Sequence, residues 1–233
     1  MTFTDFQRAG NQGANPSLYE IENRALDRPG LVLDAMRRLA PWDGRILVDL
    51  GCGSGFWLPI YADSGAEVIG VEPDPELVPL AAARDPRVRV LAGSAEHIPL
   101  DDASVDVVHA RFAYFFPPDI DAGLAEVMRV LRPGGALVVV DNDQRRGEFA
   151  TLLDGSEWAL PQGFADTTDA WWAARGASRT EVMSSWQFDS RADLDAVLHL
   201  EFPAPIADRW LAANPSATGL SYGYVLFCCR KPA

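Results

Sequence analysis

The chain has 233 residues, enough to bury a full hydrophobic core, and no linker rich in proline, glycine or serine divides it. We therefore expect a single domain over residues 1–233. Its 20 basic and 33 acidic side chains give a net charge of −13, which would repel nucleic-acid phosphates and anionic membrane surfaces. Composition thus predicts neither nucleic acid nor membrane as a partner.

The first 16 residues are polar and lack the basic start and apolar run of a signal peptide, and no apolar run approaches the ~20 residues of a bilayer span. A cytoplasmic protein is expected. The three cysteines, Cys52, Cys228 and Cys229, cannot all pair and do not have the spacing of a zinc site. Reduced thiols and no metal are predicted.

Two helices are expected before the first strand, over Pro16–Ala25 and Arg28–Leu39. Asp27 is placed to cap the second helix, with Pro29 in its first turn. Residues 1–40 then either form a lid over the mouth of a site or pack on the sheet.

Between Arg45 and Asp141, apolar runs alternate with helical patterns. The expected strands are Ile46–Leu50, Glu67–Val71, Val88–Ala92, Val105–Ala110 and Ala136–Asp141. The expected helices are Phe56–Gly65, Pro75–Arg84 and Ile120–Leu131. Such alternation predicts an α/β fold, a parallel sheet with helices on both faces and ligands at the carboxyl ends of its strands.

Residues 142–233 follow a different pattern and are expected to add substrate-side elements and closing strands. The helical patterns are Glu148–Leu153, Thr168–Ala174, Arg191–His199 and Ala204–Ala212. Two β-rich runs, Ser184–Phe188 and Tyr222–Cys229, are expected to close the sheet as an antiparallel pair.

A glycine turn, Asp49 to Gly55, directly follows the first strand. Glycines at alternate positions allow a sharp turn and close approach of a ligand, and the first turns of a following helix would point their amides at it. The dinucleotide pattern G-x-G-x-x-G fails, because Phe56 and Leu58 occupy the final position in the two possible frames. A nicotinamide oxidoreductase is therefore disfavoured, and no phosphate-binding Gly-Lys-Ser/Thr motif is present.

Further segments accompany this turn. Glu72 ends the second strand, where a carboxylate can accept hydrogen bonds from both hydroxyls of a ribose, although a surface glutamate is the alternative. The segments Gly93–Leu100 and Leu131–Gly135 follow the third strand and precede the fifth, respectively, with Asp106–Ala110 forming the fourth.

In order and spacing, these segments resemble the class I S-adenosylmethionine-dependent methyltransferase family over Arg45–Asp141. The resemblance implies a Rossmann-like, doubly wound and mostly parallel seven-stranded sheet whose last strand is antiparallel. It also implies S-adenosylmethionine as cofactor and a small-molecule methyl acceptor as partner.

The resemblance implies a cofactor site at twelve positions. They are Asp49, Gly51, Cys52, Gly53 and Gly55 in the turn, Glu72 and Pro73, Ser94, Ala95 and Glu96, and Ala110 and Arg111. The glycine turn would line the methionine and ribose, Glu72 the ribose diol, and Ala110 and Arg111 the sulfonium. Whether Ser94 or Glu96 serves the adenine amine is left open. Cys52 is expected to be a small buried residue in the turn rather than a reactive thiol.

Methyl transfer to a hydroxyl needs a base, whereas an amine need only arrive unprotonated. The candidates for such a base are His109, Asp141, Asp143 and Tyr114, and the alternative is that no base is used. His97 is expected near the adenine pocket and His199 in a structural position.

Aromatic residues suggest the acceptor. The cluster Phe112–Phe116 follows the fourth strand as a wall for the acceptor, and four tryptophans later in the chain are either core or pocket: Trp158, Trp171, Trp172 and Trp186. The expected function is methyl transfer to an oxygen or nitrogen of a small apolar or aromatic metabolite. The alternative is a cofactor-binding module without methyl transfer, a sensor or a cyclase. A monomer and a homodimer are equally compatible with the sequence.

Overall fold

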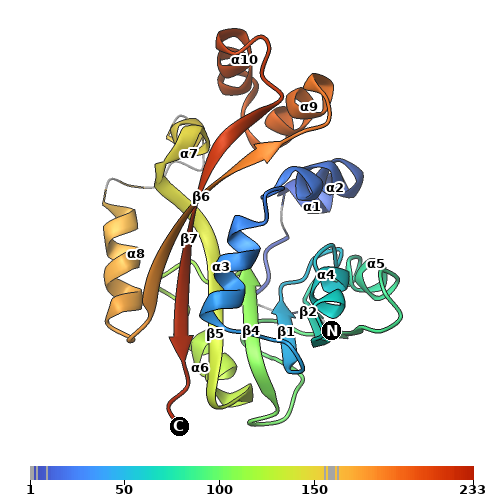
Figure 1. Ribbon diagram of the computed structural model, residues 1–233, viewed down its shortest axis with the longest axis vertical. Coiled ribbons are helices and arrows are strands. Elements are labelled where there is room, and N and C mark those ends of the chain that lie inside the picture. The colour runs from blue at the N-terminus through green and yellow to red at the C-terminus, as the bar shows by residue number, and fades with distance from the viewer. Residues whose placement is uncertain (1–2, 4, 9, 155, 157–160, 162) are drawn as a thin grey trace.

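The computed structural model describes residues 3, 5–8, 10–154, 156, 161 and 163–233, so Trp158 lies outside the described residues. In this part of the chain, seven strands form one sheet in the order β3-β2-β1-β4-β5-β7-β6 (Figure 1). The strands are β1 Ile46–Leu50, β2 Glu67–Glu72, β3 Arg89–Ala92, β4 Val105–Arg111, β5 Leu131–Arg146, β6 Ser178–Gln187 and β7 Gly219–Arg230. The helices are α1 Gly10–Ala14, α2 Pro16–Ala25, α3 Leu31–Leu39, α4 Leu58–Asp63, α5 Val78–Ala82, α6 Asp121–Val130, α7 Gly147–Leu153, α8 Phe164–Ala173, α9 Arg191–Glu201 and α10 Ala204–Ala213. No helix among the described residues is both long enough and apolar enough to cross a membrane.

The strand directions confirm the predicted fold class. Strands β3, β2, β1, β4 and β5 pair in parallel, while β7 runs antiparallel to both of its neighbours, β5 and β6. The last strand is therefore the antiparallel one. Strand β6 begins at Ser178, six residues before the predicted start. The prediction missed its first half because that half is a polar edge strand, with charged residues at Arg179 and Glu181.

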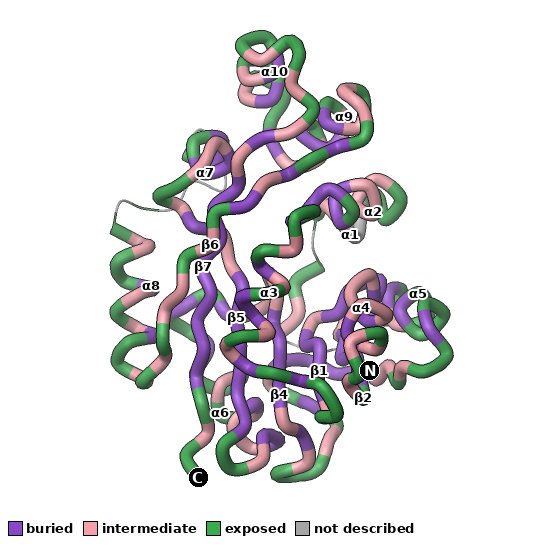
Figure 2. The backbone as a smooth tube through the Cα atoms, in the orientation of Figure 1, coloured by how far each residue is buried: buried purple, intermediate pink, exposed green. Residues whose placement is uncertain are grey.

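Alternation along the central strands divides the core between the two faces of the sheet. Leu47, Val107 and Val138 belong to the core that packs against α3 and α4. Their neighbours Val48 and Val108 belong to the core on the opposite face, which includes residues of α6 and α8. Figure 2 shows the middle of β5 and β7 as buried, so the centre of the sheet is covered on both sides.

The helix α3 begins at Leu31, three residues later than predicted, so Pro29 lies before the helix and not in its first turn, whereas Asp27 does cap the helix. Asp27 accepts hydrogen bonds from the backbone N–H groups of Leu31, Val32 and Leu33 at 3.0, 2.8 and 3.2 Å. It also accepts the Ser184 hydroxyl of β6 at 2.7 Å. One buried carboxylate thus satisfies the start of the helix and fixes it to the sheet.

Two predicted boundaries were wrong near the glycine turn and at β5. Helix α4 begins at Leu58 rather than Phe56, so the turn is not followed at once by helical amides. The segment Leu131–Gly135, predicted as a loop before the fifth strand, is the start of β5. Its pairing with β4 is interrupted by a register shift, and Gly134 has φ 79°. Both deviations concern glycine-rich backbone that hydrophobic periodicity does not describe.

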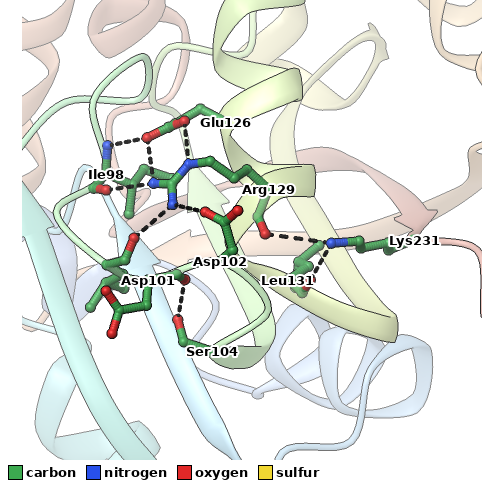
Figure 3. A network of polar contacts seen from close by, with 9 residues as sticks. Ile98, Asp101, Asp102, Ser104, Glu126, Arg129, Leu131 and Lys231 are labelled. Carbon is green, nitrogen blue, oxygen red and sulfur yellow. Dashed lines mark hydrogen bonds and ion pairs between the residues drawn. The ribbon is translucent and has the colours of Figure 1, made fainter.

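Arg129 on α6 anchors the loop that follows β3 (Figure 3). Its guanidinium donates to the carbonyl oxygens of Ile98 and Leu100 at 2.9 and 2.8 Å and pairs with the carboxylates of Asp102 and Glu126, each at 2.7 Å. Glu126 in turn accepts the Ile98 N–H at 3.0 Å. This network holds the loop on the side of the sheet where Ser94 and Ala95 lie, which fixes the position of the predicted adenine site.

The connection between β6 and β7 carries α9 and α10 away from the central sheet (Figure 1). Helix α2 packs against α9, although the two are far apart in the sequence. The N-terminal and C-terminal parts of the chain therefore meet beyond the carboxyl ends of the parallel strands.

Candidate active site

A cavity of about 1140 Å³ opens at the carboxyl ends of the parallel strands. It is lined by the ends of β1 and β2, the loops after β3 and β4, and the part of β5 near Asp141. Residues from the N-terminal segment Asp5–Gln12 and from α2 and α9 line its other walls. Ligand pockets typically have about 300–1,000 Å³, so this cavity has room for a nucleotide-sized ligand and a small second molecule.

Gly51 and Gly53 in the glycine turn each combine a left-handed backbone conformation with a lack of space for a Cβ. Gly51 has φ 74°, and a Cβ there would lie 2.6 Å from the Ala113 Cβ. Gly53 has φ 58°, and a Cβ there would overlap the side-chain amide of Gln12 from α1. The turn is therefore shaped for close approach, and α1 already lies against it.

Glu72 is held by the backbone of the same turn. Its Oε2 accepts the Gly53 N–H at 2.8 Å and its Oε1 accepts the Asp74 N–H at 2.9 Å. The carboxylate is buried and lines the cavity, and burial raises its pKa. Asp74 next to it receives the Arg8 guanidinium at 2.9 Å, and Arg8 also pairs with Glu76, so the N-terminal segment is fastened to this end of the cavity.

Ser94 and Glu96 differ in what they already bind. Ser94 lines the cavity at 2% exposure, and its hydroxyl has no hydrogen-bond partner within the described part of the chain. Glu96 does not line the cavity and accepts the Tyr114 hydroxyl at 2.7 Å. Of the two, Ser94 is the side chain that lines the cavity and has an unpartnered polar atom there.

Other predicted cofactor residues lie behind the cavity wall. Asp49 lies on the same face of the sheet as Leu47 and is buried. Burial raises the pKa of its carboxyl to about 7, and the positive charge of Arg111 opposes that rise. The Arg111 guanidinium lies over the Trp57 ring at 3.5 Å. Cys52 is buried, burial raises the pKa of its thiol, and its Sγ would lie 2.9 Å from a Cβ at position 70. This placement agrees with a small buried residue at Cys52.

The end of the cavity away from Glu72 is aromatic. Phe112 and Phe149 line it together with Tyr19, Phe202 and Tyr222. Phe149 and Tyr222 stack with ring centroids 3.9 Å apart. The cavity thus joins a polar end at the glycine turn to a flat, ring-lined end.

Comparison with known proteins finds methyltransferases among the proteins to which this chain is similar. Residues 48–139 match the family described as "Methyltransferase domain". An uncharacterized methyltransferase of Mycobacterium tuberculosis is 40% identical over 122 residues, which are 52% of this chain and 50% of that protein. The malonyl-[acyl-carrier protein] O-methyltransferase of Serratia marcescens is 32% identical over 113 residues, 48% of this chain and 40% of that protein.

A solved structure from Anabaena variabilis agrees in fold. This putative methyltransferase from an antibiotic biosynthesis pathway matches with a TM-score of 0.61 at 17% identity, over 88% of this chain and 98% of that one. Residues 48–139 are therefore similar in sequence to methyltransferase domains, and the likeness to the solved structure shows the fold. The alignments span about half, or less, of the length of the two curated relatives, so the match identifies the domain.

The cavity brings together some of the predicted cofactor residues and leaves others outside its wall. Those that line it are Gly51, Glu72, Pro73, Ser94 and Ala95. Those that do not are Asp49, Cys52, Gly53, Gly55, Glu96, Ala110 and Arg111.

His109 is not brought to the cavity. It alternates with Val108 and Ala110 along β4, so its ring lies on the α3 and α4 face, fully buried, with Trp42 and Tyr61 each 5.1 Å away between ring centroids. Burial lowers its pKa to about 3, and neither ring nitrogen has a partner among the described residues. A neutral core imidazole is the result.

Of the other three candidate bases, Asp141 and Tyr114 line the cavity and Asp143 does not. Asp141 lines the cavity, accepts the Asn142 N–H at 2.7 Å, and has its pKa raised to about 6 by burial. Tyr114 also lines it, and burial raises its pKa to about 12. Asp143 is 3% exposed, accepts the Arg145 N–H at 3.0 Å and lies outside the cavity.

Three of the four rings in the predicted aromatic cluster after β4 line the cavity. Phe112, Tyr114 and Phe116 line the cavity, while Phe115 is core. Trp172 and Trp186 are each 1% exposed and belong to the core, and Trp171 stacks with the Arg175 guanidinium at 3.5 Å.

Sequence reasoning missed two carboxyls that line the cavity, one buried at Glu22 and one half-buried at Glu201. Glu22 lies on α2 and Glu201 is the last residue of α9, and both line the aromatic end. Their separation of 179 positions carries no pattern that joins them. The only available signal was a charged residue within the apolar pattern of α2, beside Ile21 and Ala25.

Proposed function

We propose that this protein binds S-adenosylmethionine at the glycine-turn end of the cavity and transfers its methyl group to an oxygen or nitrogen of a small, apolar or aromatic molecule. One observation carries the proposal: Glu72, Ser94 and the aromatic residues line the same cavity. Donor and acceptor would then meet without leaving the protein.

The residues present fit the cofactor. Glu72 has carboxylate lone pairs beyond the two that Gly53 and Asp74 occupy, which suits a ribose diol. The unpartnered Ser94 hydroxyl suits the exocyclic amine of adenine, with Ala95 and Pro73 beside it. Gly51 lines the cavity, and the missing Cβ at Gly51 and Gly53 lets Ala113 and Gln12 lie close against the turn.

The bound cofactor would supply a methyl group on a positively charged sulfur. The chain itself would contribute orientation and exclusion of water, through Phe112, Tyr114 and Phe116 on one side and the N-terminal segment on the other. Arg8, paired with Asp74 and Glu76, would hold that segment as a lid over the donor end.

A hydroxyl acceptor would lose its proton to Asp141. This carboxylate lines the cavity, and a pKa raised to about 6 leaves it ionised at neutral pH yet more basic than an ordinary aspartate. Tyr114 hydrogen-bonds Glu96 with its hydroxyl, so we assign it to the wall rather than to proton transfer.

The test is release of S-adenosylhomocysteine from S-adenosylmethionine in the presence of a panel of phenols, aryl alcohols and arylalkylamines. Turnover with any member supports the proposal, and Gly53→Arg should abolish it. Cofactor binding without turnover across the panel would instead support a non-methylating module such as a sensor or cyclase.

A further inference from the structure

Two carboxyl groups line the aromatic end of the cavity: that of Glu22, which is buried, and that of Glu201, which is half-buried. Glu22 is 5% exposed, and its Oε2 has no hydrogen-bond partner within the residues that the structure describes. The carboxyl of Glu22 interacts with that of Glu201, and Glu201 accepts the Asn11 side-chain amide at 2.7 Å. We refer to Glu22 and Glu201 as the carboxyl pair.

No cation of the described chain compensates the carboxyl pair. Neither carboxyl forms an ion pair or hydrogen bond with a lysine, arginine or histidine among those residues. Burial and the proximity of the second carboxyl raise the pKa of Glu22 well above its ordinary value, and burial raises that of Glu201. Because two adjacent carboxyls resist carrying two charges, they share a proton and one negative charge.

Aromatic rings surround this charge. Tyr19, Phe149 and Phe202 line the same end of the cavity, together with Tyr222, whose hydroxyl donates to the Asn142 side chain. Ring faces and an unpartnered carboxylate oxygen are together the complement of an organic ammonium group. A neutral alcohol would satisfy the oxygen but leave the charge without a counterion.

We propose that the carboxyl pair is the recognition site for a protonated amine on the methyl acceptor, with the aromatic walls taking its flat body. The acceptor class is thus an aromatic molecule with an alkylammonium group, whose methyl goes to another oxygen or nitrogen because a protonated nitrogen has no lone pair, and this inference rests on the proposed function for its role in methyl transfer. The ammonium N–H would donate to Oε2 of Glu22, and the ligand charge would compensate the one negative charge that the pair carries beside its shared proton. Amine affinity should therefore fall on acidification, as the pair becomes fully protonated.

Other titratable groups near the pair could contribute to that pH dependence. They are Tyr19 on α2, His199 on α9, Tyr222 and Tyr224 on β7, Asp141 on β5, Arg111 at the end of β4 and Asp27. The tyrosines have their pKa raised by burial and stay neutral, and His199 is already engaged by the Asp195 carbonyl and Asp208. Asp141, with a pKa of about 6, and His199, whose pKa is raised above its ordinary value, also change charge on acidification, so variants are needed to separate their effect from that of the pair.

The experiment measures ligand affinity by calorimetry in protein with and without S-adenosylhomocysteine. Phenethylamine and tryptamine are compared with their neutral counterparts, 2-phenylethanol and tryptophol, at pH 7.5 and 5.0. At pH 7.5 each amine should bind about tenfold more tightly than its alcohol, which corresponds to roughly 1.4 kcal/mol. The preference should disappear at pH 5.0, while alcohol affinity stays constant.

Glu22→Gln and Glu201→Gln should each lower amine affinity about tenfold and change alcohol affinity less than twofold. The matched control is Glu67→Gln, which removes the same charge from an exposed strand start and should change neither. If one of the two variants does not fold, the other still decides the question, because each changes the carboxyl pair and leaves Asp141 in place.

Equal affinity for amine and alcohol, or no binding of either amine, would overturn the inference. The proposed function fails separately, if S-adenosylhomocysteine does not bind. In that case the amine preference measured without it still supports or rejects the carboxyl pair as an ammonium site.

Discussion

Replacing His109 with phenylalanine should make the protein less sensitive to acid without abolishing methyl transfer. The imidazole is fully buried against Trp42 and Tyr61, and its pKa is lowered to about 3. Since an unfolded histidine titrates near 6.5, the unfolded chain binds a proton between these values that the folded chain excludes. The stability that His109 contributes as a neutral ring is therefore lost as pH falls below 6.5.

The magnitude follows from the two pKa values. Between pH 7.5 and 5.0, the linkage amounts to about 2 kcal/mol of unfolding free energy for this one group. Urea unfolding followed by tryptophan fluorescence at the two pH values gives the change for the unmodified protein and for His109→Phe. The variant should lose about 2 kcal/mol less, because phenylalanine fills the ring site without a titratable nitrogen.

A matched variant at His199 should behave in the opposite sense. Its pKa is raised by the Asp195 carbonyl and by Asp208, so its contribution is present at low pH and lost as pH rises through its folded pKa. His199→Gln should therefore lose stability mainly at pH 5.0. An identical pH dependence for His109→Phe and the unmodified protein would refute the placement of His109, as would loss of turnover in a folded His109→Phe protein.

Three further predictions concern the cofactor end and its support. Gly53→Ala should lower stability by about 1–2 kcal/mol in urea unfolding, because φ 58° is left-handed and the added Cβ meets Gln12; unchanged stability would contradict this. Glu72→Gln should weaken S-adenosylhomocysteine binding about tenfold by calorimetry, since one charged acceptor becomes an amide, and equal affinity would argue against a ribose contact. Asp27→Ala should lower the free energy of unfolding in urea at neutral pH by about 2 kcal/mol, because three helix N–H groups lose their acceptor, and it should not alter cofactor affinity. A decrease of less than 0.5 kcal/mol would show that solvent replaces the cap.

The parallel core of the fold was predictable because its strands are short apolar runs separated by helical patterns. The glycine turn and Glu72 follow the first two strands directly, so their meeting at one edge of the sheet was a consequence of topology. The polar first half of β6 was not predictable, since an edge strand carries no apolar alternation.

The face of the sheet on which a side chain lies was harder to predict from the sequence than the strand to which the residue belongs. Asp49 and His109 are adjacent in the sheet register and share a face, yet nothing in either strand says which face borders a ligand. The carboxyl pair was beyond sequence reasoning for another reason. The pair depends on the packing of α2 against α9, and no local sequence pattern in either helix predicts that contact.

The central claim is tested most directly by titrating the purified protein with S-adenosylhomocysteine in a calorimeter. We predict one binding site per chain, affinity in the micromolar range or tighter, and loss of binding in Gly53→Arg, whose side chain would occupy the position of Gln12 against the turn. No binding to the unmodified protein, or equal binding to Gly53→Arg, would contradict the account.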